Sequence, residues 1–168
     1  MALSGIQKTV VIMLAAVAAV IGLTVHKVTR PVPLDSDRLS QAGIFLFEQP
    51  REIPTVSMRS ADDQPWGVDA LSGQWDLLFF GYTFCPDICP TTMAELRQLV
   101  TSLPAEQRAQ WQVTMVSVDP NRDTPAQMRS YLDFFNAGFQ GVTGDPEQLA
   151  RLAQALSVAY IEPDTSSE

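Results

Sequence analysis

Cys85 and Cys89 are the only thiols in the chain, and three residues separate them. An apolar run at residues 75–82 precedes them and predicts a buried strand, and residues 90–103 predict a helix after them. The free N–H groups and the positive dipole end of that helix favour a thiolate over a thiol. Thiolates attack disulfides and bind soft metals such as Cu(I). The spacing therefore predicts a redox or soft-metal site at the junction of strand and helix.

A purely structural disulfide is the alternative interpretation of this pair. The stabilisation from a disulfide grows with the length of the loop it closes, so a bond between Cys85 and Cys89 would add little. At the following helix, Pro90 suits the first helical position, and Thr92 with Glu95 has the spacing of a capping box. A start a few residues earlier is compatible with the same residues.

The first 30 residues predict a membrane-targeting segment. Residues 9–25 carry no charge, and their length is at the short end for a membrane-spanning helix. Lys8 precedes this run and Lys27 follows it, so the positive-inside rule gives no orientation. A cleaved signal peptide is the alternative, but the apolar run is long for one and holds its small residues inside the run. We predict an uncleaved signal anchor over residues 1–30 and a linker over residues 31–39.

The rest of the chain is strongly acidic. From residue 31 onward there are eight Arg, no Lys and 19 acidic residues, which gives a formal charge of −11. Nucleic-acid binding needs a basic surface, so this charge argues against it and is compatible with a basic partner. Two close thiols behind a membrane-targeting segment fit an exported, redox-managed compartment. The absence of other cysteines excludes a larger disulfide framework.

Strands and helices are expected to alternate over residues 40–168. Residues 112–118 are apolar and β-branched and predict a second buried strand. A helix at residues 125–136, capped by Thr124, is expected to follow it, and residues 145–156 predict a third helix. Shorter runs predict further strands at residues 43–47, 53–58 and 158–161. This order predicts an α/β sandwich with parallel strands, in which the thiols lie at the ligand-binding edge of the sheet.

Two segments together resemble the Sco/SenC family. They are residues 80–92, FGYTFCPDICPTT, and residues 117–125, SVDPNRDTP, and the resemblance extends over about residues 40–165. It implies a thioredoxin-like fold and a membrane-anchored protein that helps to assemble the binuclear copper centre of cytochrome c oxidase. The family's metal-binding cysteines map onto Cys85 and Cys89. The resemblance also implies a domain that faces the periplasm from the bacterial inner membrane, with the mitochondrial intermembrane space as the alternative compartment.

One copper ligand of the family has no counterpart in this sequence. It is a His in an Asp-His-Ser motif on a hairpin, expected just beyond residue 168, whereas the single His here is His26 beside the apolar run. Further strands and a final helix of the thioredoxin-like fold are expected in the same segment. We therefore expect residues 40–168 to be an incomplete domain of a longer product. Two thiolates alone suit Cu(I), whereas Cu(II) favours an additional imidazole.

Two functions of different classes follow from the same thiols. As a copper metallochaperone, which is not an enzyme, the protein would bind copper through Cys85 and Cys89 and pass it to the copper-bearing subunit of the oxidase. As a thiol–disulfide reductase, it would keep the copper-site cysteines of that subunit reduced, with Cys85 attacking and Cys89 resolving. Other copper chaperones or thiol reductants are further expected partners. A redox or copper sensor is a third role compatible with these residues.

Overall fold

The computed structural model describes residues 5–29 and 36–161, which belong to two compact units, Met1–Glu48 and Gln49–Glu168. In the first unit, α1 (Gly5–Thr29) is followed by the short helix α2 (Ser36–Gln41). The part of α1 from Gly5 to Lys27 is long and apolar enough to cross a membrane, a property that cleavable signal sequences share. The anchor over residues 1–30 and the linker over residues 31–39 stay predictions, and residues 30–35 lie outside the described part of the chain.

Among residues 49–161, five strands form one sheet in the order β2-β1-β5-β4-β3. The longest pair is parallel, and it runs in register from Trp75 opposite Trp111 to Gly81 opposite Ser117. β4 also pairs in parallel with β5, whereas β1 is antiparallel to both β5 and β2. The strands are β1 (Met58–Ser60), β2 (Pro65–Trp66), β3 (Trp75–Gly81), β4 (Trp111–Ser117) and β5 (Gln140–Thr143).

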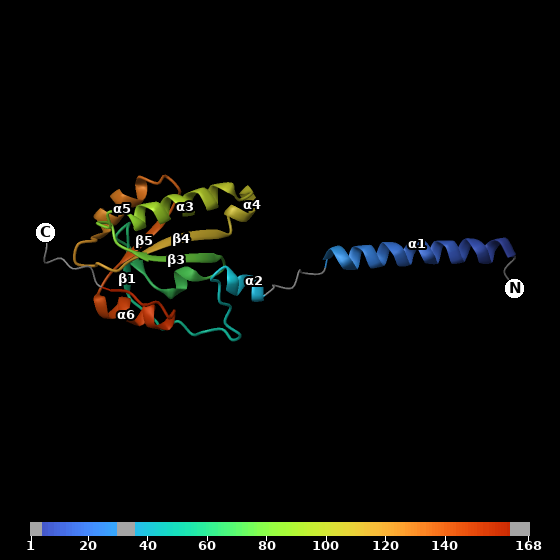
Figure 1. Ribbon diagram of the computed structural model, residues 1–168, viewed down its shortest axis with the longest axis horizontal. Helices are drawn as coiled ribbons and strands as arrows, with labels where there is room; N and C mark the ends of the chain where they lie inside the picture. The colour runs from blue at the N-terminus through green and yellow to red at the C-terminus, as the bar shows by residue number, and fades with distance from the viewer. Residues whose placement is uncertain (1–4, 30–35, 162–168) are drawn as a thin grey trace. The chain divides into compact units, whose positions relative to one another are not determined.

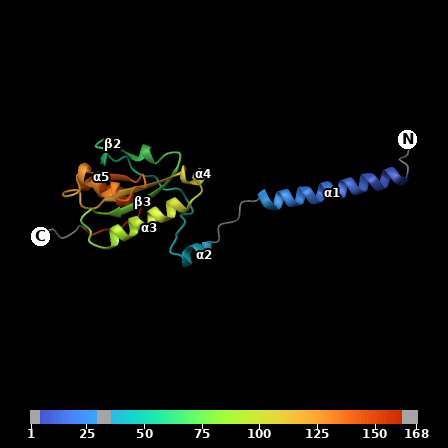
Figure 2. The same cartoon turned by 90° about the horizontal axis from the view of Figure 1, so that it is seen from above.

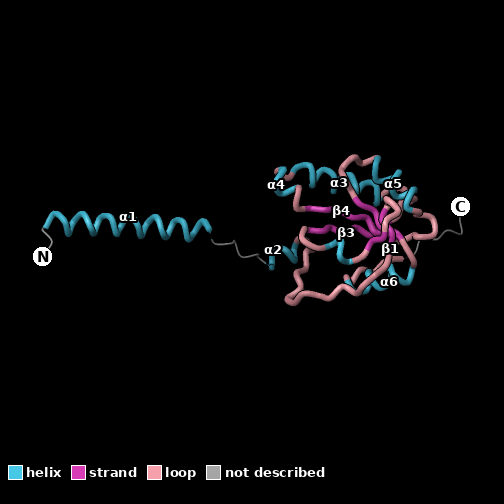
Figure 3. Tube along the Cα trace, turned by 180° about the vertical axis from the view of Figure 1, so that it is seen from behind, coloured by secondary structure: helices cyan, strands magenta, loops and turns pink. Residues whose placement is uncertain are grey.

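Helices cover both faces of this sheet (Figures 1 and 3). α3 (Ile88–Ser102) and α5 (Pro125–Asp133) lie on one face, seen from their own side in Figure 2, and α6 (Pro146–Ala155) lies on the other. The 3-10 helix η1 (Val68–Leu71) precedes β3, and α4 (Ala105–Arg108) precedes β4. Parallel strands need such crossover connections, and α3 and α5 supply them for β3–β4 and β4–β5. The result is the α/β sandwich that the sequence predicts.

Each face of the sheet carries its own apolar core. On the side of α3 and α5, Met93, Met115 and Met128 are fully buried together. On the side of α6, Val116, Val142 and Leu152 are fully buried together. Neighbours along β4, Met115 and Val116, point to opposite faces, as expected for a strand buried on both sides. Because the sheet is packed on both faces, the ends of β3 and β4 are held in place. The loops that follow these strands therefore begin at fixed positions.

The structure confirms the long elements and corrects the short ones. Residues 43–47 and 158–161 form no strand, and in the predicted strand at residues 53–58 only Met58 belongs to β1. β5 was not predicted. A Cβ on its Gly141 would lie 2.6 Å from Cδ1 of Leu132, so this strand needs a glycine to let α5 approach. A glycine weakens the strand pattern in the sequence, which explains why β5 was missed.

The start of α5 follows the predicted cap, whereas the start of α3 does not. Thr124 Oγ1 accepts a hydrogen bond from the backbone N–H of Gln127 at 3.2 Å, which confirms the cap of α5. α3 begins at Ile88, two residues before Pro90, and the hydroxyl of Thr92 donates to the carbonyl of Ile88 instead of capping the helix. The earlier start places Cys89 inside the first turn of α3.

Candidate metal and redox site

The two cysteines lie where β3 ends and α3 begins. Cys85 belongs to the connecting turn, and Cys89 is the second residue of α3. Both are free thiols with buried side chains, 8% exposed for Cys85 and 3% for Cys89. The backbone N–H of Cys89 donates to Sγ of Cys85 at 3.3 Å. The first N–H groups of a helix have no partner within the helix, so the sulfur of Cys85 satisfies one that would otherwise be orphaned.

The surroundings of the two thiols shift their pKa values in opposite directions. Burial raises the pKa of Cys85, but hydrogen bonds from the Cys89 thiol and from backbone N–H groups at the start of α3 outweigh it, so the pKa is lowered overall. Burial, the hydrogen bond with Cys85 and the negative charges of Cys85 and Asp123 raise the pKa of Cys89 to about 11, although the backbone of Tyr82 opposes this. Cys85 is therefore the thiol that ionises first.

A buried carboxylate holds the segment that leads to Cys85. Asp123, in the loop after β4, is fully buried, and its carboxylate accepts hydrogen bonds from the backbone N–H of Thr83 at 3.1 Å and from the Thr83 hydroxyl at 2.6 Å. It also accepts from the hydroxyl of Ser117 at 2.6 Å, while the amide of Gln127 donates to the Thr83 hydroxyl at 3.3 Å. These hydrogen bonds connect the loop that follows β3 to the loop that follows β4.

The same loop after β4 also contacts Phe84. Arg122 forms an ion pair with Asp119, whose side chain is 4% exposed. The guanidinium carbon of Arg122 lies 4.9 Å from the centre of the Phe84 ring, which is cation–π geometry. Residues 117–125 thus hold both residues that precede Cys85, which gives this second sequence segment a structural role in the site.

Gly81, the last residue of β3, lets the thiols approach the sheet. A Cβ at this position would lie 2.7 Å from Cε1 of Phe79 and 3.2 Å from Sγ of Cys89. Both distances are shorter than ordinary van der Waals contact, so a larger residue would push Cys89 or the Phe79 ring away. The glycine is required for the close approach of α3 to the end of β3.

The structure brings Cys85 and Cys89 together as the sequence predicts, while their roles stay predictions. His26 lies in α1. Within residues 5–29 and 36–161, no group of three His, Cys, Asp or Glu side chains is placed to hold a metal ion. The sequence interpretation did not identify the clamp formed by Asp123 and Thr83. The signal for it was the segment 117–125, which belongs to the resemblance.

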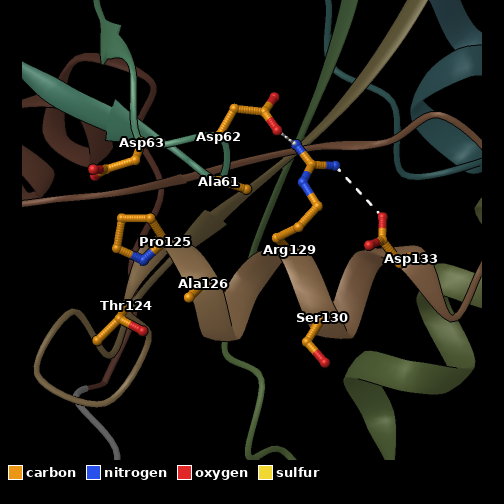
Figure 4. A pocket seen from close by; sticks show the side chains of 9 residues that line it. All are labelled: Ala61, Asp62, Asp63, Thr124, Pro125, Ala126, Arg129, Ser130 and Asp133. Atoms are coloured by element: carbon orange, nitrogen blue, oxygen red, sulfur yellow. Dashed lines mark ion pairs between the residues drawn. The ribbon is translucent and has the colours of Figure 1, made fainter.

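The domain has a pocket with a volume of about 670 Å³. None of the nine residues that line it belongs to the segment 82–90, which carries the thiols (Figure 4). Arg129 lies between Asp62 and Asp133 there, with N–O distances of 2.6 Å and 3.7 Å. These carboxylates are largely exposed and already paired with Arg129, so we assign no ligand to this pocket.

Comparison with known proteins supports the assignment suggested by the two sequence segments. The SCO1/SenC family model matches residues 49–168. The chain belongs to the SCO1/SenC family. It is 47% identical over 130 residues to a protein of Stutzerimonas stutzeri that is named for copper binding, an alignment that covers 77% of this chain and 63% of that protein. It is also 44% identical over 89 residues to the mitochondrial SCO2 homolog of Bos taurus, which covers 52% of this chain and 34% of that protein.

Solved structures of the SCO1/SenC family share the fold. ScoI of Bradyrhizobium japonicum, determined with copper bound, is 30% identical, with a TM-score of 0.61 over 68% of this chain and 73% of that chain. The sheet flanked by α3, α5 and α6 is therefore thioredoxin-like, as predicted. The chain spans less than two thirds of the length of both relatives named above, 63% and 34% respectively.

Proposed function

We propose that this SCO1/SenC protein binds copper through Cys85 and Cys89 and delivers it during assembly of the binuclear copper centre of cytochrome c oxidase. One observation carries the proposal: two free, buried thiols, one with a lowered pKa, share the start of α3 in a chain of this family. Thiolates are the ligands that Cu(I) prefers. The Bradyrhizobium relative, which is 30% identical, holds copper in its structure.

The two thiols have different parts in binding. Cys85 offers a thiolate that backbone N–H groups already stabilise, so it is the first ligand of an incoming Cu(I) ion. Cys89 keeps its proton until the metal displaces it, because metal binding requires deprotonated ligands and releases protons. The ion then leaves by ligand exchange, in which thiolates of the acceptor replace Cys85 and Cys89 one at a time. Copper stays Cu(I) throughout this exchange, so no electron donor is required.

We further propose that α1 anchors the protein in the bacterial inner membrane and that the thioredoxin-like domain faces the periplasm. The length and apolar composition of α1 support this placement. The acidic charge of the rest of the chain is compatible with a hydrated domain outside the membrane. Fusions of a periplasm-dependent enzyme reporter after residue 161 should be active, and a cytoplasm-dependent reporter at the same place should be inactive.

Copper transfer tests the proposed function directly. The full chain, reduced, loaded with Cu(I) and held in lipid nanodiscs, is mixed with the copper-free soluble domain of the oxidase subunit. We expect the copper content of that domain to rise, and the optical bands of the mixed-valence binuclear centre to appear once a one-electron oxidant such as ferricyanide is added. The variant with both Cys85→Ser and Cys89→Ser should transfer no more copper than empty nanodiscs. Equal transfer by the variant and the wild type would contradict the proposal.

The opposite pKa shifts of the two thiols favour a second candidate, a thiol–disulfide reductase. The Cys85 thiolate would attack a disulfide of the oxidase subunit, forming a mixed disulfide and releasing one substrate thiol. Cys89 would then attack the mixed disulfide, forming the Cys85–Cys89 disulfide and releasing the second thiol. Two electrons pass to the substrate, and a dithiol reductant must later restore the pair. Trapping the mixed disulfide with a Cys89→Ser variant in the absence of copper would favour this function over copper delivery.

A further inference from the structure

The loop that carries the thiols alternates buried sulfurs with exposed apolar side chains. Phe84 is 46% exposed and Ile88 is 72% exposed, whereas Cys85 between them is 8% exposed. Pro86 is exposed as well. We call Phe84, Pro86 and Ile88 the apolar collar. Because these residues lie within three positions of Cys85 in the chain, we expect a macromolecule that reaches the sulfur of Cys85 to contact them.

We propose that the apolar collar is a docking surface for a protein segment that carries apolar side chains on both sides of its own cysteine. This inference rests on the proposed function, since copper transfer and disulfide exchange both require a sulfur of the partner to reach Cys85. Burial of apolar surface on both sides of the incoming cysteine would hold the two sulfurs together during the exchange. A small thiol without such flanks gains nothing from the collar.

The collar is held in place before any partner arrives. Asp123 fixes Thr83, the guanidinium of Arg122 lies over the ring of Phe84, and Ile88 is the first residue of α3. A surface that is already ordered loses little conformational entropy on binding, which makes a few exposed side chains effective in recognition. The loop is therefore suited to select a partner as well as to bind metal.

Charge narrows the chemistry of the partner. Asp87 lies within the collar loop and is exposed, the Arg122 guanidinium beside Phe84 is paired with Asp119, and the chain from residue 31 onward carries a formal charge of −11. An acidic segment would be repelled, so the segment that docks should be neutral or basic next to its apolar side chains. We commit to a neutral or basic, apolar-flanked cysteine segment as the occupant of the collar.

Exposed apolar side chains elsewhere in the domain provide a matched control. Trp75 is 66% exposed and begins β3, at the end of the strand opposite to the thiols. It resembles the collar residues in exposure and apolar character, but it does not flank a cysteine. If docking depends on apolar side chains next to Cys85, and not on non-specific hydrophobic binding, replacing Trp75 should leave the rate of disulfide exchange at Cys85 unchanged.

The test uses two short peptides, each with one cysteine linked to thionitrobenzoate. In one peptide Leu residues flank the cysteine, and in the other Ser residues do; both carry one Lys. The full chain with Cys89→Ser, in nanodiscs, supplies a single thiol. Its Cys85 thiolate attacks the peptide sulfur, the peptide–thionitrobenzoate bond breaks, a Cys85–peptide disulfide forms, and coloured thionitrobenzoate leaves. The measured quantity is the ratio of the two rate constants, which cancels any change in the ionisation of Cys85.

We expect the Leu-flanked peptide to react about tenfold faster than the Ser-flanked peptide, the discrimination that loss of a good interface contact typically produces. Adding Phe84→Ser and Ile88→Ser should reduce the ratio to less than about twofold, Ile88→Ser alone should give an intermediate ratio, and Trp75→Ser should not change it. Equal rates for the two peptides on the starting protein would overturn the inference. So would a preference that survives the collar substitutions.

Other occupants and the proposed function give distinguishable outcomes. If the collar instead joins two copies of this chain, the collar substitutions will lower the oligomeric state in light scattering and leave the peptide ratio unchanged, which overturns the inference. If copper transfer to the oxidase domain fails while the peptide ratio behaves as expected, the proposed function is wrong and the docking surface stands. If copper transfer succeeds while the two peptides react equally fast, the proposed function stands and the docking surface is wrong.

Discussion

The clamp formed by Asp123 predicts a large loss of stability from a very small change. Asp123→Asn keeps the shape of the side chain but replaces one carboxylate oxygen with an amide that donates hydrogen bonds. In the structure one oxygen accepts from Ser117 at 2.6 Å and from the Thr83 N–H at 3.1 Å, and the other accepts from the Thr83 hydroxyl at 2.6 Å. In either orientation of the amide, its NH2 group faces a group that donates a hydrogen bond in the native protein.

The magnitude follows from these bonds. A buried donor left without an acceptor costs about 1–3 kcal/mol, and hydrogen bonds to a charged acceptor are worth roughly 1 kcal/mol more than neutral ones. Relief from burying the carboxylate charge opposes this loss. We expect a net destabilisation of about 2–4 kcal/mol. Because Thr83 is released, iodoacetamide should also alkylate Cys85 faster in the variant than in the wild-type protein.

Urea unfolding of the reduced full chain in nanodiscs, followed by tryptophan fluorescence, measures the difference in free energy. Asp133→Asn is the matched control, since the Asp133 side chain is 67% exposed and lies 3.7 Å from its partner Arg129. It should change the free energy of unfolding by less than about 0.5 kcal/mol. A neutral or stabilising Asp123→Asn substitution would refute the reasoning, because it would show that the cost of burying the charge exceeds the value of its bonds.

Four further predictions concern the thiols and the elements around them. With rising pH, iodoacetamide should label Cys85 first and Cys89 only as the pH approaches about 11, and mass spectrometry of the labelled peptides would reveal a reversed order. Because folding raises the pKa of Cys89, its contribution to stability should be complete below about pH 8.5. That contribution should be lost as the pH rises towards about 11, so urea midpoints that stay constant through this range would contradict the assignment. Gly81→Ala should destabilise the domain by roughly 1–3 kcal/mol through its contact with Cys89 and lower the affinity for Cu(I), whereas unchanged urea midpoints and Cu(I) affinity would show that the loop adapts. Thr124→Ala should cost about 1 kcal/mol in urea unfolding through loss of the α5 cap, and Thr124→Ser should restore most of it; an alanine variant as stable as the wild type would argue against the cap.

The sequence predicted the elements whose patterns are long and whose caps are local. The strand before Cys85 and the helix after Thr124 were predicted because apolar runs and capping residues act within a few positions of one another. β5 was missed because its glycine serves the packing of α5, a contact between residues distant in the sequence. The predicted strand at residues 43–47 was wrong because a short apolar run does not by itself specify a partner strand.

The sequence predicted the reactive thiols of the site but not the hydrogen bonds that hold them in place. Two cysteines at the junction of a strand and a helix were predicted from their spacing together with the patterns of the residues before and after them. The hydrogen bonds that Asp123 accepts from Thr83 join positions 40 residues apart, and they depend on β3 and β4 being parallel and in register. The sequence left open an earlier start of α3 but did not place it at Ile88, because the hydrogen bond from the Cys89 N–H to the Cys85 sulfur replaces a conventional side-chain cap.

Cu(I) titration of the reduced protein tests the central claim most directly. A chromophoric Cu(I) chelator competes with the full chain, in nanodiscs and without oxygen, for a limited amount of copper. We predict that the wild-type protein removes one equivalent of Cu(I) from the chelator. Cys85→Ser and Cys89→Ser should each weaken this binding, and the double variant should remove none. Binding by the double variant that equals that of the wild type would contradict the assignment of Cys85 and Cys89 as the copper ligands.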